Sequence, residues 1–138
     1  MKNGLLSILG VAGAFISNIY GGWDAALTTL AIFMAIDWIT GIIVAGVFKK
    51  SKKTESGALE SKAGLMGLFK KFAMLIAVFV AYRLDMLAGT TVLKDGAIIA
   101  FVANEAISII ENTGTMGVQW PAIITNAIDV LKKKGDTT

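Results

Sequence analysis

The sequence predicts an all-α integral membrane protein with four transmembrane helices, or three if the first apolar segment lies on the surface, plus a short C-terminal amphipathic helix. Apolar residues make up 55% of the 138 residues, charged residues make up 17%, and the mean hydropathy is +0.70. A soluble domain of this size has too little interior to bury so much apolar surface. Four apolar segments are separated by short polar stretches, and the lysines cluster in only some of these stretches. We therefore expect one membrane domain over residues 1–138.

The first two predicted spans cover residues 4–22 and 25–48. The first contains no charged residue, and the second contains only Asp37. A spanning helix needs about 20 mostly apolar residues, which the second segment satisfies outright and the first satisfies with its flanks. Lys2, the Leu/Ile run and the small residues at 12–14 also resemble a signal peptide, so a leader sequence is an alternative for the first segment.

The third and fourth predicted spans cover residues 70–89 and 96–112. Arg83 lies near the far end of the third, and we expect its side chain to extend to the outer headgroups. The fourth is short, and Asn104 and Glu105 lie within it. An acidic residue at a helix centre costs about 2.5–3.5 kcal/mol, whereas each Leu, Ile, Phe or Val returns about 0.3–0.6 kcal/mol. The fourth helix is therefore marginal in lipid and needs other helices, or water, along its polar side.

The lysines predict the orientation in the membrane. Seven of them lie between Lys49 and Lys71, three more form the run 132–134, and the opposite connections hold only Lys94. Positive loops stay in the cytoplasm, so we expect a cytoplasmic basic loop over residues 49–69 and both termini in the cytoplasm. The loop lies between spans and has no interleaved aromatic residues, so nucleic-acid binding is not expected; attraction to anionic lipid headgroups is the natural secondary role.

A turn built on Gly114 and Gly117 follows the fourth span, and an amphipathic helix is predicted over residues 121–134. Pro121 is suited to the start of this helix. Apolar side chains recur on one face at helical spacing, at Ile123, Ile124, Ala127, Ile128 and Leu131. We expect the helix to lie along the inner membrane surface or against a neighbour.

The polar residues of the fourth segment share one side of the helix. At 100° per residue they lie within an arc of roughly 120°; they are Asn104, Glu105, Ser108, Glu111 and Asn112. We interpret Glu111 and Asn112 as the helix end at the inner headgroups. Asn104 and Glu105 lie roughly 10 Å deeper, so the interface does not explain them.

Asp37 lies near the middle of the second span, and Thr40 and Gly41 follow one turn later. One interpretation is a hydrogen-bonded carboxyl group that joins helices. The other is an Asp that faces a lumen or a subunit interface after assembly.

The chain contains neither cysteine nor histidine. Disulfides and thiolate chemistry are excluded, and the usual zinc sites and Ser-His catalysis are not expected. We therefore expect no metal, no cofactor and no enzymatic activity.

Four sequence blocks resemble the phage holin family of the toxin-secretion and lysis type, which includes clostridial and bacillus phage holins. The blocks are "GGWDAAL", "IDWITGI", "SKAGLMGLFKK" and "NEAISIIENTGTMGVQWP", and they lie in the family's order over residues 20–131. The linker "KKSKKTESGALE" is longer and more basic than is typical. The matching family positions are Asp37, Trp38, Gly41, Lys62, Gly64, Gly67, Lys70, Lys71, Asn104, Glu105, Ser108, Glu111, Asn112, Gly114, Gly117 and Pro121.

This resemblance implies a protein that accumulates in the host's cytoplasmic membrane and associates with itself to form holes. The holes would release a cell-wall hydrolase, the endolysin, and lysis would follow. The implied partners are the lipid bilayer, further copies of the chain, an endolysin coupled to it functionally, and an inhibitory anti-holin. A non-lytic exporter of a toxin or other protein remains an alternative. A small ion or proton channel subunit is another, with Asp37 and Glu105 on the proton path.

Overall fold

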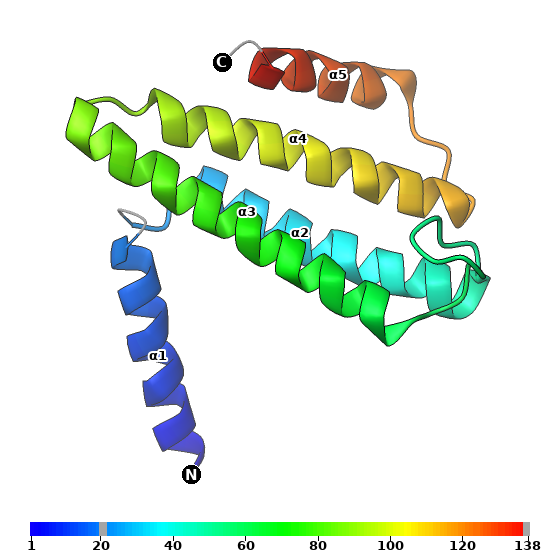
Figure 1. The fold of residues 1–138 in the computed structure, drawn as a ribbon, viewed down its shortest axis with the longest axis horizontal. Helices are drawn as coiled ribbons and strands as arrows, with labels where there is room; N and C mark the ends of the chain where they lie inside the picture. Colours follow the sequence, from blue (N-terminus) through cyan, green and yellow to red (C-terminus); the bar gives the residue numbers. More distant parts are fainter. Residues whose placement is uncertain (20–21, 137–138) are drawn as a thin grey trace.

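The computed structural model describes residues 1–19 and 22–136, and this part of the chain contains helices and no strand (Figure 1). The elements are α1 (Lys2–Ile19), α2 (Ala25–Ile43), the π-helix η1 (Val44–Phe48), α3 (Ser61–Ala88), α4 (Val92–Thr115) and α5 (Ala122–Asp136). The predicted all-α fold class is confirmed. Residues 20 and 21, which belong to the first predicted span, lie outside the described residues.

Among the described residues, three helices are long and apolar enough to cross a membrane: α1, α2 with η1, and α3. The helix that falls short is α4, whose composition had already marked it as marginal. Two boundaries differ from the prediction. α3 begins at Ser61, so the last nine residues of the predicted loop 49–69 are helical, and α4 extends beyond the predicted 96–112 at both ends.

Helices α2, α3 and α4 pack together as a three-helix bundle, with α4 in contact with both of the others. Its apolar core consists of buried side chains from all three helices: Leu27, Leu30, Met34, Met74, Val78 and Ile98. In lipid, where burial from water no longer drives association, close packing of such side chains holds helices together.

Asp85 ties the end of α3 to the start of α4. Its Oδ1 accepts hydrogen bonds from Thr90 Oγ1 (2.6 Å) and the backbone N–H of Leu93 (3.1 Å), and its Oδ2 accepts from the N–H of Lys94 (2.7 Å). The first N–H groups of a helix have no partner within the helix and carry partial positive charge. Asp85 is 2% exposed and satisfies two of them from a neighbouring helix. Arg83, in contrast, is exposed.

The same end of the bundle has a second set of polar contacts. Asp24 Oδ1 accepts from the backbone N–H of Leu27 at 2.7 Å and so caps α2. Lys94 Nζ lies 3.6 Å from Asp24 Oδ2 and 5.1 Å from the centre of the Tyr82 ring. Side chains of all three helices therefore meet at this end.

At the opposite end, the loop after η1 folds back on itself. Lys49 ends the helix in the left-handed region (φ 55°), and Gly57 also has a positive φ of 76°. The backbone N–H of Ser51 donates to the Gly57 carbonyl at 2.9 Å. A Cβ atom at Gly57 would lie 2.4 Å from the Lys49 carbonyl oxygen, so only glycine fits there.

The turn between α4 and α5 begins later than predicted. Gly114 still belongs to α4, and its carbonyl accepts from the N–H of Gly117 at 3.0 Å, where φ is 108°. Trp120 Nε1 donates to Thr113 Oγ1 at 2.8 Å, which fixes the turn to the last part of α4. Pro121 immediately precedes α5.

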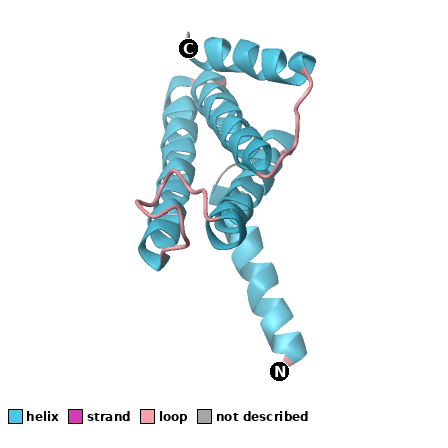
Figure 2. Cartoon of the chain, turned by 90° about the vertical axis from the view of Figure 1, so that its right-hand side faces the viewer, coloured by secondary structure: helices cyan, strands magenta, loops and turns pink. Residues whose placement is uncertain are grey.

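Helix α5 packs against α4 and runs back along it, so that its C-terminal end points toward the end of the bundle that holds the α3–α4 turn (Figure 1). The lysine pattern had predicted that the run 132–134 lies on the same side of the membrane as the basic loop, which is at the other end of the bundle. Of this run, only the side chain of Lys133 is described, and the side chain of Leu131 is likewise outside the described part. Helix α1 contributes no buried residue and projects away from the bundle in both views (Figure 2).

We predict that Asp85→Ala lowers the midpoint of thermal unfolding in detergent, because it leaves two N–H groups of α4 without their partner. Asp95→Ala is the matched control, since Asp95 is an exposed acid in the first turn of the same helix. Circular dichroism during heating measures both midpoints. An equal shift for the two variants would contradict the role of Asp85.

Candidate functional site

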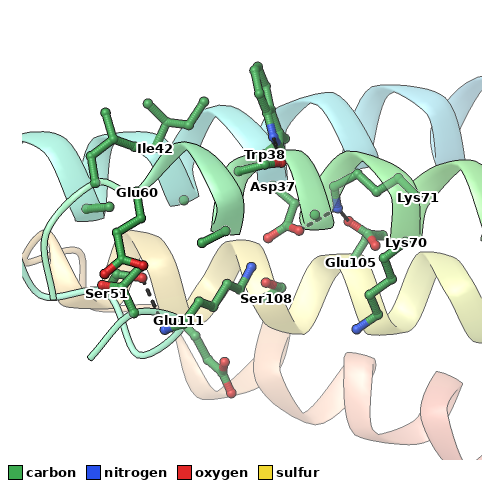
Figure 3. A pocket seen from close by; sticks show the side chains of 18 of the residues that line it. Asp37, Trp38, Ile42, Ser51, Glu60, Lys70, Lys71, Glu105, Ser108 and Glu111 are labelled. Carbon is green, nitrogen blue, oxygen red and sulfur yellow. Dashed lines mark hydrogen bonds and ion pairs between the residues drawn. The ribbon is translucent and has the colours of Figure 1, made fainter. Parts of the chain in front are cut away.

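Lys71 joins three helices through two buried carboxylates. Its Nζ lies 2.6 Å from Asp37 Oδ2 on α2 and 2.6 Å from Glu105 Oε2 on α4 (Figure 3). Asp37 is 4% exposed and Glu105 is 2% exposed. Lys71 itself belongs to α3, so this ion-pair cluster fixes the relative positions of α2, α3 and α4.

Asn112 extends the cluster along α4. Its Nδ2 donates to Asp37 Oδ1 (3.2 Å), to the Asp37 carbonyl (3.3 Å) and to Thr40 Oγ1 (2.9 Å). Thr40 Oγ1 in turn donates to the carbonyl of Ile36 at 2.8 Å. A Cβ atom at Gly41 would lie 3.8 Å from Asn112 Nδ2. A larger side chain at Gly41 would therefore extend into the space that the Asn112 amide occupies.

The cluster lies at the edge of an open cavity of about 290 Å³ between the bundle and the folded loop. Its wall is formed by α2, α3, α4 and the loop, and includes Lys53. Glu60, Lys70, Ser108 and Glu111 also line it (Figure 3). A water molecule occupies about 30 Å³ in the liquid. The cavity is therefore large enough to hydrate the cluster from the loop end.

The two ion pairs carry one negative charge in excess when both carboxylates are ionised. Burying a charge costs several kcal/mol, and the attraction between partners offsets this cost only with good geometry and further hydrogen bonds. Lys71 supplies the geometry, and Asn112 supplies hydrogen bonds to Asp37. Lys53 and Lys70 also line the cavity, but Glu60 and Glu111 line it too, so the cavity wall as a whole keeps one negative charge in excess.

The start of α3 is attached to α2 through Trp38. Its Nε1 donates to the Gly64 carbonyl at 3.1 Å. A Cβ atom at Gly67 would lie 3.7 Å from Trp38 Cδ1, so the indole packs directly on the α3 backbone. The hydrogen bond and the ring contact together attach the start of α3 to α2.

The residues of the predicted polar side of α4 have different environments in the structure. Glu105 is buried in the cluster, and Asn112 points to α2 rather than marking the helix end at the headgroups. Asn104 and Glu111 are exposed beside the cavity, and Ser108 lines it. Four other residues from the family motifs do not line the cavity: Lys62, Gly114, Gly117 and Pro121.

Sequence reasoning missed two features of the site. It counted Lys71 in the topology signal of the basic loop and among the family positions, but did not pair it with Asp37 or Glu105. Two buried acidic residues favour a nearby cation, and Lys71 lies one residue inside the predicted third span. Sequence reasoning also gave Asp85 no role. That role depends on the α3–α4 turn placing a helix start beside the carboxylate, which a linear pattern does not reveal.

The arrangement provides helix–helix attachment and a hydrated polar surface. No group of three or more His, Cys, Asp or Glu side chains that could hold a metal ion is present in the described part of the chain. The cluster is therefore best understood as a set of charges that hold each other inside an apolar bundle.

Comparisons with known proteins identify relatives over most of the chain. A family model described as "Bacteriophage holin family" matches residues 14–133. An uncharacterised protein of Listeria innocua is 35% identical over 133 residues, which cover 95% of this chain and 89% of that protein. A Clostridium perfringens protein, also uncharacterised, is 34% identical over 136 residues, with 97% and 94% coverage. A "probable holin" of Bacillus phage phi105 is 32% identical over 111 residues, with 80% and 76% coverage. No solved structure matches the chain.

We predict that Lys71→Met destabilises the folded chain by about 3–5 kcal/mol, because it leaves two carboxylates buried without a cation. Unfolding in detergent measures the loss. The triple variant Asp37→Asn, Lys71→Met, Glu105→Gln is the control, since it removes all three charges together and should recover most of the stability. A triple variant no more stable than Lys71→Met would show that the charges are not what makes the single change costly.

Proposed function

This chain belongs to the bacteriophage holin family, and we propose that it associates with itself in the bacterial cytoplasmic membrane and opens holes through which a cell-wall hydrolase leaves the cytoplasm. Lysis of the host then follows. Proteins of this family are non-enzymatic membrane pore formers, so the polar cluster serves the assembly rather than a reaction.

The observation that carries this proposal is the enclosure of the ion-pair cluster within a single chain. Asp37, Lys71 and Glu105 contact one another in the bundle interior, and large apolar side chains are exposed on the outer surface of the bundle. Exposed apolar side chains follow α3 along most of its length, at Phe69, Phe72, Ile76, Val80, Leu84 and Leu87. Lys71 and the two carboxylates therefore contact one another instead of lipid, as is required of a chain that accumulates in the membrane before it opens holes.

Opening requires the opposite arrangement, with polar groups facing water. Asn104, Ser108 and Glu111 already border the cavity. If α4 separates from α2 and α3 when copies assemble, Lys71 and its two carboxylates join them on one hydrated surface. The charges then regain hydration in exchange for the ion pairs, so the difference in free energy between the closed and open states is small.

A pore through one chain is less well supported. The cavity reaches the ion-pair cluster from the loop end, and beyond the cluster the apolar core fills the bundle. Within the described residues, a proton or ion would meet Met34, Met74 and Val78 instead of a polar path. A channel subunit that conducts alone is therefore a weaker candidate than a protein that conducts only after assembly.

The proposed arrangement in the membrane follows from the lysines and from the helices. The basic loop and the N-terminus lie in the cytoplasm, and α1, α2 and α3 cross the bilayer. All of the apolar surface of α1 is available to lipid or to other helices, because α1 has no buried residue. We further propose that α4 is the fourth span and crosses as part of the bundle.

Expression in a bacterium with and without a cytoplasmic cell-wall hydrolase tests the proposed function. We expect abrupt loss of membrane integrity in both cultures, measured by entry of a membrane-impermeant dye. Breakdown of the wall, measured as loss of turbidity, should occur only when the hydrolase is present. Ion leakage without release of the hydrolase would instead favour a small channel.

We also predict that Glu105→Gln and Asn104→Leu each delay lysis. The first removes the excess negative charge and stabilises the closed bundle, and the second makes the surface that must face water less polar. Glu55→Gln is the charge-matched control, since Glu55 is an exposed loop residue that does not line the cavity. The time from induction to dye entry is the measurement. Timing equal to that of the control in both variants would remove this surface from the mechanism.

A further inference from the structure

Helix α4 is covered on opposite sides. From Lys94 to Thr113 its exposed residues are Asp95, Asn104 and Glu111, all of them polar. Ala103 is 1% exposed and Glu105 is 2% exposed. These residues are two positions apart, so at 100° per residue their side chains point in roughly opposite directions, and both sides of the helix are covered. The Glu105 side contacts α2 and α3, and α5 covers the other side (Figure 1).

The α5 helix is a poor permanent cover for a membrane helix. Asn126, Asp129 and Lys133 are exposed on it, and so are Ile123 and Val130, which are 78% and 65% exposed. If α4 crosses the bilayer, α5 in this position holds an Asp and a Lys at membrane depth, which is costly. An amphipathic helix of this kind is stable at the membrane surface.

The charge pattern supports a second position for α5. Lysines 132–134 have the same sign as the basic loop and belong on the same side of the membrane. Packing along α4 carries the end of α5 toward the opposite end of the bundle (Figure 1). If α5 leaves α4 and turns at Gly117 onto the inner membrane surface, its charged residues leave the membrane interior and its lysines lie on the same side as the basic loop.

We propose that α5 is an autoinhibitory helix: in the resting chain it occupies the face of α4 around Ala103 that a second copy of this chain contacts during assembly. This inference rests on the proposed function, since it names the surface through which the copies associate. Gly96 and Ala100 lie on the same side of α4 as Ala103, at spacings that let two helix backbones approach closely. The face already accepts one helix, namely α5.

A second copy fits the exposed face better than lipid does. Around the helix axis, Asn104 lies about 100° and Glu111 about 80° from Ala103. Both residues therefore border the face around Ala103, and both are exposed. Lipid offers neither of them a hydrogen-bond partner. A second α4 in the same orientation brings its own Asn104 to the border, and two side-chain amides can donate to and accept from each other.

Disulfide cross-linking in the full chain tests the proposal, because the sequence contains no cysteine and each introduced cysteine reports a single position. Ala103→Cys is compared with Val102→Cys, whose side chain packs against the chain's own core. Each is combined with Ile128→Glu, which places a charge at a half-buried position of α5, or with Val130→Glu, the same charge at an exposed position. The membranes are oxidised at intervals after induction.

We expect Ala103→Cys to form cross-linked dimers as dye entry begins, and Val102→Cys not to. Ile128→Glu should raise the early yield of the Ala103→Cys dimer several-fold and advance dye entry, and Val130→Glu should change neither. If Ile128→Glu fails to accumulate in the membrane, Trp120→Phe replaces it, since this change removes the hydrogen bond to Thr113 without adding a charge. Dye entry without any Ala103→Cys dimer overturns this inference and leaves the proposed function standing. Absence of dye entry from the unaltered chain overturns the proposed function instead.

Discussion

The structure depends on one constraint: two acidic side chains within apolar helices are buried, and among the described residues Lys71 is the cation paired with both. This requirement sets how far α3 can slide along its neighbours, because Asp37 lies on α2 and Glu105 on α4. The apolar core and the cavity then fall on opposite sides of the ion-pair cluster. Asn112 donates a further hydrogen bond to the Asp37 carboxylate, and Thr40 accepts one from the same amide group.

The same constraint links the stability of one chain to its capacity to assemble. A bundle held only by apolar contacts would gain nothing from water and would stay closed. A bundle held by hydrated charges alone would not remain in lipid. The cluster combines the two, because its charges are paired inside one chain and yet lie beside a cavity that water can enter.

Much of the fold follows from the sequence, because long apolar segments and lysine runs are local signals. The helices, their order and the polar side of α4 were all predicted from them. The contacts between helices were not, since periodicity shows which residues share a face and not which faces meet. For this reason Asn112 was assigned to the headgroups although it binds Asp37, and Lys71 was assigned to topology although it binds two carboxylates. For α5 the sequence left two positions open, the inner membrane surface or a neighbouring helix, because its amphipathic pattern is compatible with both; the structure places it along α4.

The three hydrogen bonds that Asp85 accepts limit how α3 and α4 can move relative to each other. Residues 89–91 alone connect α3 to α4, and Asp85 holds this connection through Thr90, Leu93 and Lys94. Any rotation of one helix relative to the other therefore has its pivot near Asp85. Lys71 lies fourteen residues, or about 20 Å, from this pivot, so a rotation of about 10° moves it by about 4 Å. A small rotation at this connection is thus enough to separate α3 from α4 at their opposite ends, where the basic loop lies.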